Sequence, residues 1–411
     1  MEEGPVDASG PRRGNPADAG TPDALVDGAA GDRATVDRAG GDRADADRAG
    51  TDRTGVDPAD VDWAARAAAA EHAVVRRHLR RVGGVVPGTR IGRIRWPRAV
   101  PVRPWPWHYW WQAHLLDCLV DAQLRAPRPE RADAIAAVAR TVRLRNLGSW
   151  TNDYYDDVAW FGLAVQRAGT LARRSARPAL GAVVGQLRAG WTPDGGGGIW
   201  WRRGDDFKNA PANGPAAILL ARGGHVELAG SIVDWMHDTL LDPATGLIRD
   251  GVRVRPDGRL GPVEGTTYTY CQGVHLGACV ALGEVDGSAR WAERAAALLD
   301  AVGTHVVGPD GVVPGYDDGG DGGLFNGILA RYLADAALRR PELAPAARRI
   351  VLASATAAWE GRLEMPGGPL FAQDWRRQAR EPRPGRAEAD LSVQLSAWML
   401  LEAAAAVQRA G

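Results

Sequence analysis

Four features that many proteins rely on are scarce in this chain of 411 residues. Its only cysteines are Cys118, Cys271 and Cys279, too few for a disulfide framework. No apolar run approaches the roughly 18 residues of a membrane span. The 50 basic residues are balanced by 50 acidic ones, whereas a general nucleic-acid binder carries a basic excess. The N-terminal residues lack the positive and apolar segments of a secretory signal. We therefore expect a cytoplasmic protein without membrane or nucleic-acid partners, or a secreted one if the start codon is misassigned.

Lysine is scarcer still, because Lys208 is the only one. The other basic residues are arginines, and alanine and glycine abound. This composition indicates the drift of a GC-rich genome, which disfavours Lys, Asn, Tyr and Phe. Such residues should persist mainly where structure or chemistry requires them, so their positions guide the search for a site.

Residues 1–58 differ from the rest of the chain because they contain no aromatic residue. An Asp-Arg pair recurs every five residues from Asp32 to Arg53. A period of five matches neither a helix nor a strand, so no apolar face can form. Such a segment cannot offset its ordering entropy. We predict a disordered tail over 1–58 and a folded domain over 59–411. The alternative for the tail is a docking arm for a basic partner.

From Asp62 onward the apolar spacing is helical, and Gly, Pro and Asp interrupt it at intervals. Twelve helices are predicted, which form two alternating sets. The first set is predicted near 60–82, 129–144, 173–190, 225–241, 288–304 and 341–359. The second set is predicted near 108–126, 153–169, 208–222, 268–284, 320–338 and 390–409. No long alternating strand pattern occurs, although 248–252 could form a short hairpin.

The two sets differ in kind. Helices of the first set are amphipathic, as at 290–302, which suits an outer layer with one solvent-facing side. Helices of the second set carry aromatic and amide residues near their N-terminal ends, after Gly-rich loops. Six such hairpins predict an all-α (α/α)6 barrel whose inner N-termini meet on one face. An open solenoid is the alternative, but the hairpins share no repeated signature.

The strongest candidate for chemistry is the segment 151–164. Asn152 or Asp153 can cap the helix that follows, which places Asp156 and Asp157 in its first turn. The simplest interpretation is that these carboxylates complement the helix dipole.

Adjacent carboxylates also act on each other. One is favoured in its ionised form, while like-charge repulsion raises the pKa of the other. That difference would supply a nucleophile and a general acid, and retaining glycosidases need two carboxyls about 5–5.5 Å apart. Trp160, one turn further on, could exclude water and help to keep the acid protonated.

A glycine run at 195–198 introduces a second candidate. It lacks the Gly-Lys-Ser/Thr ending of a phosphate-binding loop, so a nucleotide hydrolase is excluded. The paired tryptophans after it could stack on a sugar or simply cover the core, and the two asparagines, four residues apart, share a helix face. The candidate binding residues here are Trp200, Trp201, Lys208, Asn209 and Asn213.

A third candidate lies at 264–273, where threonine and tyrosine hydroxyls surround a glutamine. Tyr268 and Gln272 share a helix face, and Tyr270 lies between them in sequence. Such a cluster could bind carbohydrate hydroxyls, or it could simply cap a helix.

A fourth candidate lies at 105–114, which contains more aromatic residues than a core normally needs. Trp110, Trp111 and Gln112 are the binding candidates, because aromatic faces stack on sugar rings. His108 and His114 do not share a helix face.

Other chemistries lack their signals. No zinc-binding spacing of histidines or cysteines occurs, and the acidic glycine run at 317–322 fails the spacing of a calcium loop. The G-x-S-x-G motif of serine hydrolases is absent. We expect neither a metal nor another cofactor.

In this order, the motifs resemble the family 76 glycoside hydrolases, endo-acting α-1,6-mannanases built on an (α/α)6 barrel. The resemblance spans roughly 105–400. The matching segments are Tyr109 to His114, Tyr155 to Trp160, Gly197 to Trp201, Lys208 to Gly214, Thr269 to Gly273 and Gly323 to Ile328. The last segment adds Asn326 to the candidate binding residues. Cys271 replaces a common Asn, and Phe161 replaces a common Trp.

The resemblance implies that Asp156 is the nucleophile and Asp157 the general acid/base of a retaining mechanism. It implies α-mannan or mannooligosaccharides as substrate, and we expect a monomer. Two alternatives stay open, a glycan-binding protein without catalysis and a sugar epimerase on the same barrel. An epimerase would need histidine bases on the inner helices, where only His108, His114 and His275 are available.

Overall fold

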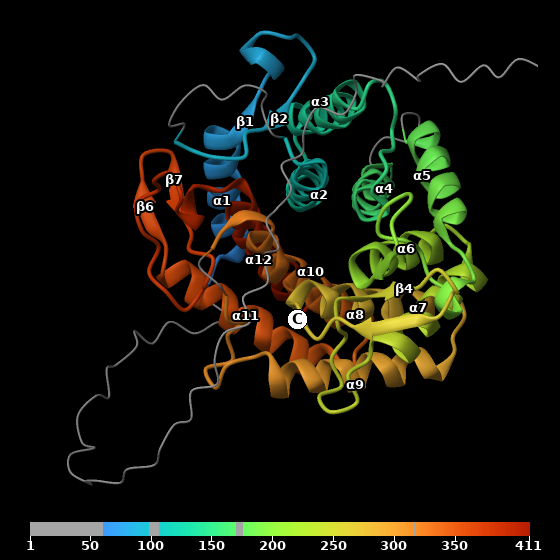
Figure 1. Cartoon of the computed structure of the whole chain (residues 1–411). Coiled ribbons are helices and arrows are strands. Elements are labelled where there is room, and N and C mark those ends of the chain that lie inside the picture. Colours follow the sequence, from blue (N-terminus) through green and yellow to red (C-terminus); the bar gives the residue numbers. More distant parts are fainter. Residues whose placement is uncertain (1–60, 98–106, 170–175, 316–317) are drawn as a thin grey trace, which may run out of the picture. The chain divides into compact units, whose positions relative to one another are not determined.

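The computed structural model describes residues 61–97, 107–169, 176–315 and 318–411, and helices dominate this part of the chain (Figure 1). The predicted tail lies outside the described residues. Twelve α-helices occur in the described ranges, close to their predicted positions. The odd-numbered helices are α1 (Trp63–His78), α3 (Pro129–Arg145), α5 (Arg177–Gly190), α7 (Val226–Leu240), α9 (Ala289–His305) and α11 (Ala344–Glu360). The even-numbered helices are α2 (Tyr109–Arg125), α4 (Tyr155–Gly169), α6 (Ala210–Arg222), α8 (Thr269–Val285), α10 (Phe325–Arg339) and α12 (Leu391–Arg409).

The even-numbered helices form a closed ring. Each packs against the next even-numbered helix along the chain, and α12 packs back against α2. The odd-numbered helices lie outside, with α3 on α2, α5 on α4, α7 on α6, α9 on α8, α11 on α10 and α12, and α1 on α12. This closure confirms the (α/α)6 barrel and excludes the open solenoid.

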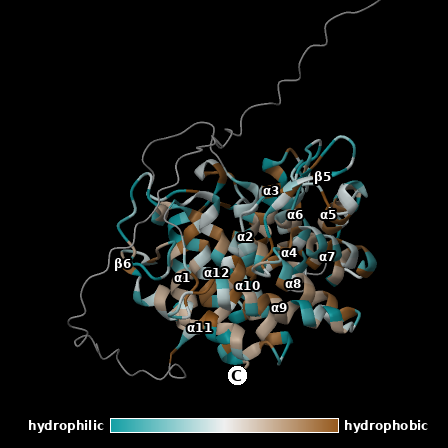
Figure 2. Ribbon diagram, turned by 60° about the horizontal axis from the view of Figure 1, so that its bottom comes forward, coloured by the Kyte–Doolittle hydropathy of each residue, from teal (hydrophilic) through white to brown (hydrophobic). Residues whose placement is uncertain are grey.

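The distribution of apolar residues around each helix determines whether it lies in the outer or the inner layer. In α9, Trp291, Leu298 and Val302 are buried while the opposite side is exposed, and Figure 2 shows hydrophilic and hydrophobic segments alternating on this helix. The inner helices are buried on nearly all sides and approach closely through glycine. A Cβ atom on Gly214 of α6 would lie 2.3 Å from the Val274 side chain of α8.

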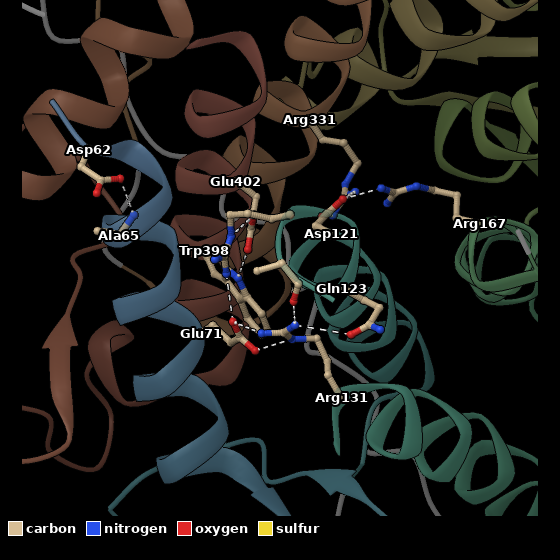
Figure 3. Close-up of polar contacts among 12 residues, drawn as sticks. Asp62, Ala65, Glu71, Asp121, Gln123, Arg131, Arg167, Arg331, Trp398 and Glu402 are labelled. Atoms are coloured by element: carbon tan, nitrogen blue, oxygen red, sulfur yellow. Dashed lines mark hydrogen bonds and ion pairs between the residues drawn. The ribbon is translucent and has the colours of Figure 1, made fainter. Parts of the chain in front are cut away.

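An ionic seam joins the first and last helices of the described domain (Figure 3). Glu71 of α1 accepts hydrogen bonds from Arg125 of α2 and Arg131 of α3, at 2.9 and 2.6 Å. Arg125 also donates to Glu402 of α12 at 2.9 Å, and the Trp398 indole donates to the same carboxylate at 3.0 Å. These side chains are largely buried, so the seam fixes the closure of the ring.

Short strands organise the loops before the inner helices. Strands β3 (Phe207–Asn209), β4 (Gly251–Val254) and β5 (Leu260–Val263) form an antiparallel sheet in that order. Two further pairs are β1 (Leu79–Arg80) with β2 (Ile91–Gly92), and β6 (Leu363–Met365) with β7 (Gly368–Leu370). The hairpin suggested at 248–252 is instead β4–β5, because Ile248 pairs with Leu241. The sheet ties the loop before α6 to the loop before α8.

One predicted helix starts later than expected. Residues Gly320–Leu324 form the 3-10 helix η4, and α10 begins only at Phe325. The glycines explain the difference, because Gly320 has a φ of 61° that an α-helix cannot accommodate. The remaining 3-10 turns are η2 (Val82–Gly84), η3 (Asp194–Gly196) and η5 (Ala387–Ala389). No helix of the described ranges has the length and apolar character needed to cross a membrane.

Candidate active site

The aspartate pair occupies the first turn of α4, as predicted. Asp156 accepts two hydrogen bonds, one on each carboxylate oxygen. Oδ1 accepts from the backbone N–H of Asp157 at 2.8 Å, and Oδ2 accepts from the indole N–H of Trp201 at 3.1 Å. Hydrogen bonds donated to a carboxylate favour its ionised form, so both donors act against protonation of Asp156.

Asp157 has a different setting. Its Oδ2 accepts from the Asn152 side-chain amide at 2.6 Å, and its carboxylate also accepts from the backbone N–H of Trp110 at the start of α2. Asn152 does not cap α4 itself, because its Oδ1 accepts from the backbone N–H of Tyr154 at 3.1 Å, one residue before the helix. It therefore orders the entry turn and positions Asp157.

Raised pKa values let the two carboxyls together retain a proton near neutral pH. Burial raises the pKa of Asp156 to about 7, against the opposing effect of its two N–H donors. Burial also raises the pKa of Asp157 well above its ordinary value, and the charge of Asp156 raises it further. None of the principal groups acting on these two pKa values is a cation. The pair is thus arranged as one carboxylate beside one carboxylic acid.

Lys208 holds the glycine loop in place. Its buried ammonium group donates to the backbone carbonyls of Asp194, Gly197 and Gly198 and to both oxygens of Thr192, at 2.7–3.1 Å. These bonds take up the donors that a sugar would need. The contacts of the sole lysine are therefore with the loop, and its expected contact with substrate stays a prediction.

The loop in turn presents Trp200 and Trp201. The Trp200 ring lies 4.3 Å from the Lys208 ammonium, a cation–π contact. Trp201 is anchored by its backbone N–H, which donates to Phe207 at 2.8 Å, while its indole N–H reaches Asp156. Both tryptophans are half-buried. Lys208 and strand β3 thus determine where the indole meets the pair.

The buried amides of the inner helices clamp loops. Gln112 of α2 accepts from the backbone N–H of Gly92 at 2.7 Å and donates to the carbonyl of the same residue at 3.1 Å. It also donates to the Trp107 carbonyl at 2.8 Å. The same two-way clamp recurs on α6, α8 and α12, where Asn213 holds Ile199, Gln272 holds Ile248 and Gln394 holds Phe371.

Several predicted sugar ligands therefore have a scaffolding role. Gln112, Asn213 and Gln272 are at most 1% exposed, and main-chain groups occupy both ends of each amide. Asn209 caps α6 by accepting from the Ala212 N–H at 3.2 Å. Asn326 accepts from the Thr269 hydroxyl at 2.8 Å and donates to the Pro314 carbonyl at 2.8 Å. The contacts of these five side chains are thus with the loops and helix ends around the site, and their sugar contacts stay a prediction.

The aromatic candidates fall into two layers. Trp110, Tyr268 and Tyr270 are half-buried, as are the two loop tryptophans. Trp111 and Trp160 are 3% and 4% exposed and lie behind them, where Trp160 contacts the His114 ring at 4.7 Å. Only the first layer can meet a ligand without rearrangement.

Two acidic residues of the site were missed. Asp250 precedes β4, and the Cys271 thiol lies 3.8 Å from its Oδ1. Burial raises the pKa of Asp250 to about 6. Its charge and that of Asp156 both act on the buried hydroxyl of Tyr270, so the three groups are neighbours. The second missed residue, Asp321, lies in η4 and accepts from the indoles of Trp110 and Trp111.

Sequence signals for these two residues were weak. Asp250 lies within the hairpin candidate 248–252, which shows no periodicity, and Asp321 belongs to the acidic glycine run that fails the calcium spacing. No cluster of three potential metal ligands occurs in the described ranges.

The histidines of the inner helices are unsuited to base catalysis. His114 and His275 are 3% and 1% exposed, and burial lowers the pKa of each to about 3. His275 stacks on His237 at 6.1 Å. Neither meets the aspartate pair, which weakens the epimerase alternative.

Comparison with known proteins gives consistent results. The sequence model of Glycosyl hydrolase family 76 matches residues 66–410. Two curated relatives carry the name mannan endo-1,6-alpha-mannosidase DCW1. The protein of Candida glabrata is 30% identical over 47% of this chain and 49% of its own length, and that of Saccharomyces cerevisiae is 28% identical over 50% and 51%. The chain thus spans about half the length of these relatives.

Solved structures agree with the fold. The GH76A alpha-1,6-mannanase of Salegentibacter sp. HEL1_6 superposes with a TM-score of 0.73 at 28% identity, over 84% of this chain and all of that chain. An inactive variant of that mannanase, with two consecutive aspartates replaced by alanine, binds alpha-1,6-mannotetrose and superposes equally well at 26% identity. With a family match over most of its length and the same barrel, the chain described here belongs to glycosyl hydrolase family 76.

Proposed function

We propose that this chain hydrolyses α-1,6-mannosidic linkages of mannan or mannooligosaccharides with retention of anomeric configuration. The observation that carries the proposal is the adjacent pair Asp156–Asp157 in the first turn of α4, where burial and mutual charge favour one carboxylate beside one carboxylic acid. The loss of activity in a related mannanase with two consecutive aspartates replaced supports the same assignment.

The roles follow the family resemblance and the two pKa shifts. Asp156, whose pKa rises only to about 7, is the nucleophile that attacks the anomeric carbon. Asp157, whose pKa is raised well above its ordinary value, donates its proton to the departing glycosidic oxygen. The mannosyl–Asp156 ester is then attacked by water, from which Asp157 removes a proton. The second step restores both side chains to their starting protonation.

The half-buried aromatic side chains provide surfaces for mannose rings. Trp110 and Trp201 flank the pair through their contacts with Asp157 and Asp156, and Tyr270 flanks it from α8. Tyr268 and Trp200 extend this surface on either side. Asp250, with its pKa raised to about 6, can exchange hydrogen bonds with a sugar hydroxyl near Tyr270.

The test compares the wild type with Asp157→Asn on linear α-1,6-mannan and on short α-1,6-mannooligosaccharides. We expect release of shorter oligomers, with the α-anomer formed first in the NMR spectrum. Asp157→Asn should lower kcat by roughly 10³-fold or more while the protein stays folded. Asp153→Asn, an exposed change three residues from Asp156, is the matched control and should remain active.

Each other outcome has a meaning. A folded protein that binds mannan without cleaving it would favour the glycan-binding alternative, and a changed monosaccharide would favour the epimerase. Preference for polymer would place the enzyme where mannan lies, outside the cell, whereas preference for short oligomers would favour an intracellular role. We propose a monomeric enzyme, which light scattering during size-exclusion chromatography tests directly.

A further inference from the structure

Asp321 joins the site from the far side of α2. It lies in η4, immediately before α10, and its Oδ1 accepts from the indole N–H of Trp111 at 2.7 Å and of Trp110 at 3.1 Å. Both tryptophans stand in the first turn of α2. One carboxylate oxygen therefore fixes the indoles of two consecutive residues.

Trp110 connects this carboxylate to the catalytic pair. Its indole N–H donates to Asp321, while its backbone N–H donates to Asp157. The negative charge of Asp321 raises the pKa of Asp157 and also that of Asp156. Trp110 thus contacts two carboxyl groups from different helices, Asp321 of η4 and Asp157 of α4.

The position of Asp321 is held by α12 and its entry turn. The backbone N–H of Gly320 donates to Asp390 at 2.9 Å, and the Ser392 hydroxyl donates to the Gly320 carbonyl at 2.6 Å. Asp390 is itself paired with Arg95 at 2.8 Å. The Gly319 N–H donates to Gln373 at 2.8 Å. Three hydrogen bonds therefore fix the backbone of the two glycines that precede Asp321, whose own side chain is exposed.

Apart from Asp250, whose pKa is raised to about 6 and which acts on Tyr270, the polar groups around the pair are neutral near pH 7. Tyr109 of α2 and Tyr270 of α8 face it, and burial raises the pKa of each well above its ordinary value. Asn152 and the Trp201 indole carry no charge. His108, which faces Asp321, has its pKa lowered mainly by burial, while Asp321 and Asp390 raise it and Arg95 lowers it. Asp321 is thus the charge outside the pair that acts on both catalytic carboxyls.

We propose that Asp321 is a positioning residue of the α-1,6-mannosidase site, which orients Trp110 and Trp111 through one oxygen and acts on the aspartate pair through its charge. The expected change in kinetics rests on the proposed function. The expected change in the ionisation of the aspartate pair does not. A purely structural residue would affect stability or binding without moving the ionisation of the pair.

The kinetic test uses Asp321→Asn, which keeps an oxygen acceptor for the indoles and removes the charge. Loss of a nearby negative charge lowers both catalytic pKa values, so the whole profile of kcat/KM against pH should move to lower pH by about 0.5–1 unit. Asp321→Ala should show the same displacement and, because the indoles lose their anchor, a further decrease of about 10-fold in kcat/KM. Asp318→Asn, an equal charge change in the same loop, is the control and should leave the profile in place.

A second readout needs no substrate. The indole N–H of Trp201 donates to Asp156, so its NMR signal in protein labelled with ¹⁵N-tryptophan should titrate with that carboxyl, and Trp201→Phe assigns it. The titration midpoint should fall in Asp321→Asn and stay unchanged in Asp318→Asn. An unchanged midpoint in Asp321→Asn would overturn the inference. Failure of the wild type on every α-1,6-mannoside would refute the proposed function instead, and the NMR titration would still decide the charge effect of Asp321.

Discussion

The same three inner helices, α2, α4 and α10, hold aspartates in two opposite electrostatic settings. At the start of α4, Asp156 and Asp157 have no cation among the principal groups acting on them, and Asp321 before α10 adds another negative charge. Further along these helices, Asp117 and Asp121 of α2 are paired with Arg167 of α4 and with Arg331 of α10, as Figure 3 shows in part.

The two regions shift the pKa of an aspartate side chain in opposite directions. Burial by itself would raise the pKa of Asp117, but Arg167 and Arg331 outweigh it, and the pKa lies below its ordinary value. At the active site burial has no such opposition, and the pKa of Asp156 rises to about 7. Catalysis requires a carboxyl that keeps its proton near neutral pH, whereas stability requires buried charges that are compensated.

A cavity of about 510 Å³ lies beside the paired cluster and not beside the catalytic pair. Its lining includes Asp117, Arg167 and Arg331, whose charges already satisfy one another. We therefore place the proposed chemistry at the uncompensated carboxyls and not at this cavity.

The largest effect should come from breaking the paired cluster. Arg331→Met removes the cation that lies 3.0 Å from Asp117 and 2.6 Å from Asp121. Two buried carboxylates would then share only Arg167, which should lower the free energy of unfolding by about 3–5 kcal/mol. Urea unfolding measures this change. A loss below about 1 kcal/mol would show that the cluster is not the stabilising counterpart of the active site.

Removing the charges of Asp156 and Asp157 should instead raise the free energy of unfolding at alkaline pH. The folded pKa of Asp156 lies above its unfolded value, so its contribution to stability is complete below about pH 4 and is lost as the pH rises through about 7. The double variant Asp156→Asn, Asp157→Asn should therefore exceed the wild type by about 1–3 kcal/mol at pH 8 and match it at pH 4. Asp117, with its lowered pKa, contributes in the other direction, and its stabilisation is lost as the pH falls through its folded pKa. Urea unfolding at both pH values measures this difference. Equal stability of variant and wild type at pH 8 would show that the aspartate pair does not destabilise the fold as the paired cluster stabilises it.

A smaller effect should follow from removing one hydrogen-bond donor to Asp156, the proposed nucleophile. Trp201→Phe keeps the ring but removes the N–H that lies 3.1 Å from Asp156 Oδ2. Since this bond lowers the pKa of Asp156, the acidic limb of kcat/KM should move to higher pH by about 0.5–1 unit. Trp200→Phe, one residue earlier in the same loop, is the matched control. Equal pH profiles for the two variants would show that the indole has no part in setting the pKa.

The sequence predicted the helices and the aspartate pair because both depend on local order. Periodicity alone identifies an amphipathic helix, and Asp156 and Asp157 need no distant partner to be recognised as adjacent. Compositional drift also drew attention to Lys208 and Asn213, and the structure shows both holding loops. It could not assign their role, since an amide that clamps a loop and an amide that binds a sugar are the same side chain.

The clamp amides are also the repeated feature that the hairpins seemed to lack. Gln112, Asn213, Gln272 and Gln394 each stand within the first turn of an inner helix and hold one residue of a preceding loop through both its N–H and its C=O. The repetition is one of geometry, because loop lengths and residue types vary between hairpins. Asp250 and Asp321 escaped prediction for a related reason, since only the closed ring brings their loops to α4.

The smallest effect should come from an ion pair that solvent reaches. Asp153 and Arg203 lie 3.5 Å apart near the start of α4, and each side chain is 64% exposed. Water screens such a pair, so Asp153→Asn should change the free energy of unfolding by about 0.5 kcal/mol or less. Compared with Arg331→Met in the same unfolding assay, this variant isolates burial, because both changes remove one partner of an Asp–Arg contact. A large loss in Asp153→Asn would mean that pairing alone, and not pairing away from water, separates the stabilising aspartates from the catalytic ones.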